Sequence, residues 1–115
     1  MTRSTLRIAF LLTAPLTLAA GMAWAAGPLT PLGQWMKPNM GAALAGSDFP
    51  ALQKNFDFVS GKAPSADYAQ WSSFAKTGSA AAAKQDLAGV KAACKSCHDN
   101  YKEKYRKEFA TRPFP

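Results

Sequence analysis

The chain has 115 residues and a formal net charge of +7, a length that allows one small domain. Its 14 basic side chains are accompanied by 7 acidic ones. This modest and mixed excess argues against a nucleic-acid-binding protein and favours brief encounters with an acidic partner protein.

The first 25 residues predict a secretory signal peptide. Arg3 and Arg7 precede an apolar stretch, and small residues at Ala23 and Ala25 suit cleavage after Ala25. A membrane anchor is the alternative, but the apolar stretch falls short of the roughly 20 residues that a spanning helix needs. We therefore expect an exported, periplasmic domain of residues 26–115, which keeps no membrane anchor and has a formal net charge of +5.

The first helical segment of this domain is predicted from Thr30 to Gly46. Thr30 is a suitable N-cap, and Leu32, Met36 and Met40 recur at a spacing of four residues, so they share one face. Pro38 lacks an amide hydrogen and predicts either a kink or a helix that starts there.

Three further helical segments follow, and no run shows the alternation of a half-buried strand. They are predicted over residues 47–61, 65–78 and 79–109. Short connections between amphipathic helices predict an all-α fold, a small four-helix bundle in a single domain.

The sequence Cys-Lys-Ser-Cys-His at residues 94–98 is the motif that carries chemistry. It is the attachment signature of a c-type haem, in which two thiols one helical turn apart bond the cofactor. His98 then follows as a standard ligand of haem iron. We expect one covalent haem c, held by Cys94 and Cys97, with His98 as the proximal iron ligand.

Three other interpretations of the motif are weaker. A thioredoxin-like cysteine pair would accompany a βαβ pattern, which this sequence lacks. A structural zinc site needs four ligands, and Cys94, Cys97 and His98 supply only three. A plain disulfide would fit poorly in a continuous helix and would leave His98 without a role.

The second axial ligand is narrowed by elimination. His98 is the only histidine of the sequence, and outside the signal segment the only methionines are Met36 and Met40. The spacing of these two methionines does not decide which of them would bind the iron. Both could instead be packing residues of the core. Trp35 and Tyr101 are candidates to contact the haem, together with three other aromatic residues: Phe49, Phe56 and Trp71.

Residues 89–101, which include the haem motif, and Trp35–Asn39 give the chain a family likeness. It resembles the class II cytochromes c, the group of cytochrome c' and its methionine-ligated, low-spin relatives. The resemblance implies a four-helix bundle with haem between the first and last helices. It also implies Met36 as the distal ligand, with Met40 as the alternative, and it is compatible with a homodimer.

The expected function is that of an electron carrier with His/Met-ligated iron and no catalytic activity of its own. The alternative is a five-coordinate, cytochrome c'-like protein that binds NO or CO, in which both methionines serve as packing. A small subunit that feeds electrons to a larger periplasmic enzyme would share the chemistry of the carrier. The basic face of the last helix would attract an acidic redox partner, or it is simply a solvated face.

Overall fold

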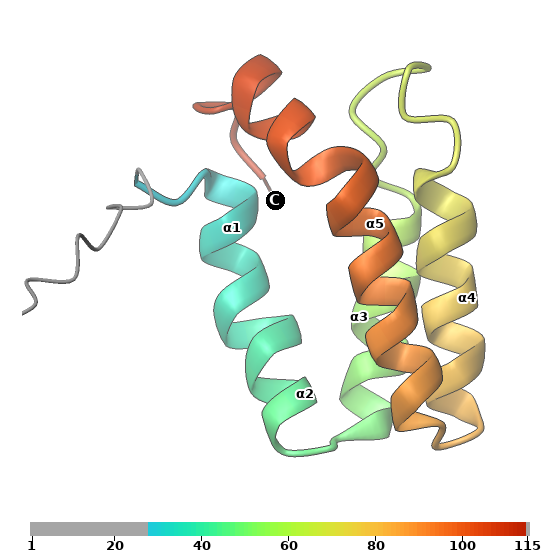
Figure 1. Cartoon of the computed structure of the whole chain (residues 1–115). Coiled ribbons are helices and arrows are strands. Elements are labelled where there is room, and N and C mark those ends of the chain that lie inside the picture. Colours follow the sequence, from blue (N-terminus) through green and yellow to red (C-terminus); the bar gives the residue numbers. More distant parts are fainter. Residues whose placement is uncertain (1–27, 115) are drawn as a thin grey trace, which may run out of the picture.

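A computed structural model of the chain describes residues 28–114, and all regular elements within this range are helices. The first helix consists of three consecutive pieces, and three continuous helices follow it (Figure 1). Their bounds are α1 Pro31–Met36, η1 Lys37–Gly41, α2 Ala42–Ala45, α3 Phe49–Ser60, α4 Trp71–Ala83 and α5 Leu87–Glu108. The prediction of an all-α four-helix bundle is confirmed, whereas the predicted signal peptide lies outside the described residues.

The first helix starts at Pro31, as predicted, and contains a π-helical turn around Pro38. The hydroxyl of Thr30 accepts the amide hydrogen of Gly33 at 3.1 Å and caps the helix. Proline cannot donate to the preceding turn, so the regular bonding pattern is interrupted. The side-chain amide of Asn39 compensates by donating to the carbonyl of Trp35 at 2.8 Å. The irregularity expected at Pro38 is therefore a widened turn within one continuous helix.

Helix α3 follows its sequence signals closely. The carboxylate of Asp48 accepts the amide hydrogen of Ala51 at 3.1 Å, and Pro50 occupies the first turn. The helix ends at Ser60, next to Gly61. Leu52, Phe56 and Val59 form its buried face, as their spacing predicts.

The predicted bounds of the third helix are wrong at both ends. Residues 65–70 form turns rather than helix, and α4 starts only at Trp71. The side chain of Tyr68 extends from this loop and is buried against α4 and α5. This tertiary packing outweighs the preference of Ser65 for the N-cap position of a helix. Gly78 does not end the helix, because α4 continues through it to Ala83. A Cβ atom at Gly78 would overlap the ring of Phe56, so this glycine serves close packing.

The predicted start of the last helix at Ser79 is also wrong. The alanine run at residues 80–83 ends α4, and Gln85 adopts a positive φ of 55° in the connection. Helix α5 begins at Leu87, where the Asp86 carboxylate accepts the amide hydrogen of Gly89 at 2.9 Å. A good N-cap therefore starts this helix eight residues later than helix propensity alone predicts.

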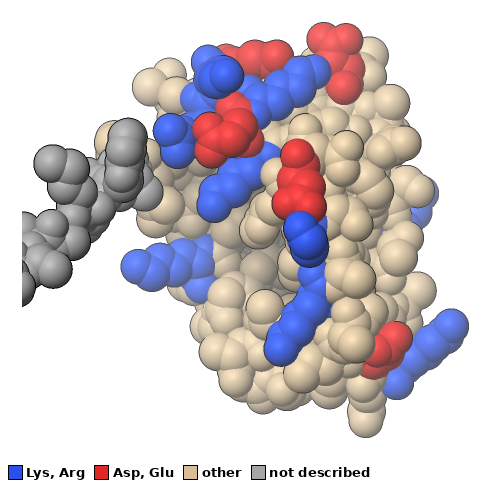
Figure 2. All heavy atoms as spheres, viewed as in Figure 1, with Lys and Arg blue, Asp and Glu red and all other residues tan. Residues whose placement is uncertain are grey.

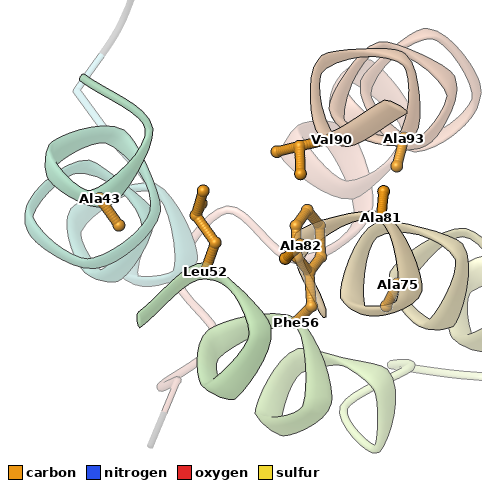
Figure 3. Packing of buried hydrophobic residues seen from close by; sticks show 8 residues of the cluster. All are labelled: Ala43, Leu52, Phe56, Ala75, Ala81, Ala82, Val90 and Ala93. Atoms are coloured by element: carbon orange, nitrogen blue, oxygen red, sulfur yellow. The ribbon is translucent and has the colours of Figure 1, made fainter. Parts of the chain in front are cut away.

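Two hydrophobic clusters form the interior. The first, here called the alanine core, joins α3, α4 and α5 through small side chains, and Figure 3 shows Ala81 and Ala93 pointing toward each other. Its members are Ala43, Leu52, Phe56, Ala75, Ala81, Ala82, Val90 and Ala93. The second, the aromatic core, lies toward the other end of these helices and contains Leu32, Val59, Tyr68, Trp71, Tyr101 and Tyr105.

The first helix is held less closely than the other three. Helix α4 approaches both α3 and α5 along its backbone, and η1 and α2 approach α3. In contrast, α1 makes no close backbone approach to α3, α4 or α5. Figure 1 shows α1 on one side and α5 on the other side of the resulting space. Among residues 28–114, no helix has the length and apolar character needed to cross a membrane.

Candidate functional site

A pocket of about 680 Å³ occupies the space between the first helix and α5. This volume lies within the range of about 300–1,000 Å³ that is typical of ligand sites. Its lining is mostly apolar, and α3 and α4 contribute the aromatic side chains of Phe56, Trp71 and Phe74. The pocket therefore has the size and lining suited to a large, mostly apolar ligand.

Cys94, Cys97 and His98 all line this pocket from α5. The two cysteines lie about one helical turn apart, so both thiols are on the pocket side of one helix. Both are free and partly buried, and the neighbouring residue His98 is more exposed than either cysteine. The predicted motif is thus continuous on the last helix, as the sequence indicated.

The pKa values of these three groups distinguish the site from a redox-active cysteine pair and favour a neutral histidine. Burial raises the pKa of Cys94. Burial also raises the pKa of Cys97, to about 11, and the nearby thiol of Cys94 adds a smaller effect in the same direction. Redox-active cysteine pairs instead depend on a lowered thiol pKa, so this environment does not favour the thioredoxin-like interpretation. Burial lowers the pKa of His98; Lys102 lowers it further, whereas Asp99 opposes the shift. His98 is therefore neutral at pH 7, which is the form that binds a metal.

Met36 and Met40 line the pocket from the first helix, across from α5. Met36 packs against the aromatic core, to which Cys97 also belongs, and Met40 packs against the alanine core. Both side chains are partly buried. The structure therefore brings both candidate sulfur ligands to the pocket that contains His98.

The aromatic candidates separate into two groups. Tyr101 lines the pocket, and its hydroxyl accepts the amide hydrogen of Gln70 at 2.9 Å. Phe56 and Trp71 also line it, whereas Phe49 is packed against the alanine core elsewhere. Trp35 does not line the pocket.

The ring of Trp35 instead packs against Phe58 and Phe114, with centroids 5.3 and 5.4 Å away. The structure thus separates Trp35 from the other predicted haem contacts. Its predicted contact with the cofactor stays a prediction.

Several pocket residues were not predicted from the sequence. Phe74 lies three residues after Trp71 on α4, and this spacing could have revealed it. Three basic side chains, which we call the basic rim, also border the pocket: Lys37, Lys102 and Arg106. Figure 2 shows basic side chains on both sides of the hollow in this face. Nothing in the local sequence of Lys37 indicates that it shares a site with residues of α5.

Comparison with known families assigns this site. A family model described as Cytochrome C' matches residues 42–102, more than half of the chain, including Cys94, Cys97 and His98. The chain belongs to the Cytochrome C' family. Members of this family carry covalently bound c-type haem and are typically exported to the periplasm. Neither the comparison with curated proteins nor that with solved structures gave a match.

The pocket of this Cytochrome C' family member fits such a haem. Its lining is apolar, and the donor set is two protonated thiols followed by a neutral imidazole. Cys94 and Cys97 would hold the haem through thioether bonds, and His98 would bind its iron. The family match starts at Ala42, after Met36 and Met40, so it carries no information on the distal ligand.

Proposed function

We propose that this cytochrome is a monohaem electron carrier in which His98 and Met36 are the two axial ligands. The observation that supports this function is the presence of methionine sulfur on the pocket wall opposite the helix that carries His98. The haem, when bound, supplies a one-electron redox centre whose potential is raised by a methionine ligand.

The protein residues have distinct roles in this proposal. Partial burial and Lys102 lower the pKa of His98, which favours the neutral imidazole that binds iron. The aromatic floor of Phe56, Trp71 and Phe74 excludes water from the apolar side of the site. Two ligands from opposite walls would keep the site similar in both oxidation states, which favours rapid electron transfer.

Met36 is proposed rather than Met40 for two reasons. The family resemblance places the methionine ligand at this position of the first helix. In addition, Met36 packs in the same cluster as Cys97, the residue next to His98, whereas Met40 packs in the cluster that contains Cys94. Met40 is the alternative ligand.

The basic rim supports an acidic redox partner. Lys37 and Arg106 are exposed, and no acidic side chain lines the pocket itself; Arg106 forms an ion pair with Glu103 at 3.6 Å on the surface of α5. A positive field at the edge of a redox site would steer an acidic protein toward it. We also propose export of the domain after cleavage of residues 1–25, and no catalytic activity of its own.

A five-coordinate protein that binds NO or CO is the second candidate function. The apolar first-helix wall, with Leu32 and Leu44 beside the two methionines, favours it because a small apolar gas would be accommodated there. In that case both methionines would be packing residues.

Absorption spectra of the haem-loaded protein distinguish the two functions. An electron carrier should show a sulfur–iron charge-transfer band in the oxidised form, and this band should vanish in Met36→Ala and persist in Met40→Ala. The reverse pattern would assign Met40. A high-spin spectrum that shifts on addition of CO or NO, and that neither substitution changes, would contradict the carrier.

A further inference from the structure

The segment after α5 folds back over the first helix. Figure 1 shows the chain leaving the end of α5 and returning into the space beside α1. Phe114 in this segment lies 5.4 Å from Trp35 of α1 and 6.0 Å from Phe58 of α3, measured between ring centroids. Trp35 and Phe58 are themselves 5.3 Å apart. Three rings from three distant parts of the chain therefore form one cluster, which we call the aromatic clasp.

The returning segment is anchored before it reaches the clasp. The ring of Phe109 packs against Tyr68 and Tyr105 of the aromatic core, at 6.0 and 5.5 Å. The guanidinium of Arg112 lies over the ring of Phe109 at 5.2 Å and donates to the carbonyl of Pro64 at 3.2 Å. Phe114 is thus held in place by contacts on both the loop and the last helix.

The aromatic clasp connects α1 to α3 where the backbones of these two helices do not approach each other. The backbone of α1 approaches none of the three continuous helices, so its orientation depends on its junction with η1 and on its side chains. Trp35 reaches α3 through the ring of Phe58, and Leu32 of the same helix is buried in the aromatic core. Aromatic contacts of this kind are individually modest but directional, so they can set the rotation of a short helix.

The rotation of α1 decides which side chain faces the haem pocket. Successive residues of a helix lie about 100° apart around its axis. With Trp35 turned toward Phe58 and Phe114, the next residue, Met36, lines the pocket. With the clasp open, only Leu32 and the junction with η1 would hold this rotation, and Met36 would face the pocket for less of the time.

We propose that Phe114 is a positioning residue for the distal side of the haem site, acting through Trp35 on Met36. It closes the clasp from the segment after α5 and thereby holds α1 in the rotation that directs Met36 inward. This inference rests on the proposed ligation for its spectroscopic consequence. The clasp itself rests only on the described contacts.

The test uses the full haem-loaded chain with Phe114→Ala. Amide hydrogen exchange in residues 31–36 should accelerate by about tenfold, while exchange in α3 and α4 stays unchanged, because only the clasp is opened. The sulfur–iron band should weaken, and CO should bind faster. Phe114→Tyr, which keeps the ring, should restore all three readouts. Thr111→Ala removes an exposed side chain of the same segment and serves as the matched control.

The outcomes separate the clasp from the proposed ligation. Unchanged exchange at residues 31–36 in Phe114→Ala would overturn the clasp, and so would equal acceleration across α3 and α4. Absence of a sulfur–iron band in the unsubstituted protein would contradict the ligation by Met36. In that case, selective acceleration at residues 31–36 would still establish the clasp.

Discussion

The alanine core and the haem pocket lie in the same bundle but are built on opposite principles. In the alanine core, small side chains let α4 approach both α3 and α5 closely, and Val90 and Leu52 are completely buried. Beside the pocket, α1 stands away from the other helices and leaves about 680 Å³ between them. One part of the domain is therefore filled by protein side chains alone, whereas the other part leaves a space with the size and lining suited to a cofactor.

Two phenylalanines of α3 compare the tightly packed alanine core, where Phe56 also borders the pocket, with the more exposed aromatic clasp. Phe56 is only 4% exposed in the alanine core, and Phe58 is 39% exposed in the clasp. We expect Phe56→Ala to lower the free energy of unfolding by about 3–5 kcal/mol. Phe58→Ala should lower it by about 1 kcal/mol, since the ring loses aromatic contacts but little burial. Denaturant unfolding of both variants measures the difference, and equal losses would refute the division into two regions.

Loss of haem attachment should affect the two regions unequally. In a Cys94→Ser, Cys97→Ser chain, the pocket has no covalent ligand, so the first helix loses its main neighbour. Its amides should then exchange about 100-fold faster than in the loaded protein, while those of α3 and α4 retain most of their protection. Hydrogen exchange resolved by segment is the measurement. Uniform loss of protection would mean that the cofactor supports the whole bundle.

Gly78 tests how tightly the alanine core is packed. A methyl group there would overlap the Phe56 ring, so Gly78→Ala should destabilise the protein by about 1–3 kcal/mol despite the higher helix propensity of alanine. At Gly61 an added Cβ would meet only the Phe58 carbonyl oxygen, 4.0 Å away. Gly61→Ala is therefore the control, with an expected change below about 0.5 kcal/mol. A stabilising Gly78→Ala would show that the core can relax.

Substitution of Tyr68 should have a small effect on the free energy of unfolding at neutral pH and a distinctive effect on its pH dependence at alkaline pH. Burial is the main cause that raises its pKa above the ordinary value of 10.0, followed by the hydrogen bond that its hydroxyl donates to Glu108 at 2.9 Å. The folded state therefore holds this proton more tightly than the unfolded state. Its contribution to stability is complete below pH 10 and declines as the pH rises above that value.

Tyr68→Phe removes both the hydrogen bond and this titration. We expect a loss of about 1 kcal/mol at pH 7 and a flatter decline of stability above pH 10. Unfolding midpoints measured between pH 7 and pH 11 provide the check. Tyr105 also has a pKa raised by burial, so Tyr105→Phe is the comparison that shows how much of the alkaline decline belongs to each residue.

The local signals that predicted the fold are those that act within one or two turns. The caps at Thr30 and Asp48, the irregularity at Pro38 and the pocket side of the haem motif are all determined by neighbours in the sequence. The boundary between α4 and α5 was not predictable from helix propensity, since the alanine run suits either helix. It is decided by the Asp86 cap, which helix propensity does not reflect.

The candidate site follows the same rule. Cys94, Cys97 and His98 were found because their chemistry lies in five consecutive residues. The orientation of Trp35 was not predictable, because Phe58 and Phe114 reach it from distant parts of the chain. The predicted helix end at Gly78 was wrong for the same reason, since the side chain that requires a glycine there, Phe56, lies on another helix.

The π-helical turn at Lys37–Gly41 has a consequence for how this site can vary in evolution. A π turn is equivalent to one residue inserted into an α-helix. It therefore rotates the residues before the turn about the helix axis, relative to the residues after it. Deletion of one residue in this turn would restore regular α geometry and rotate α1 by about 100° relative to α2. Met36 would then leave the pocket wall and another face of α1 would replace it. The face of α1 that lines the pocket is therefore set by helical phase, which deletion of Pro38 or Asn39 can change without removing any pocket residue.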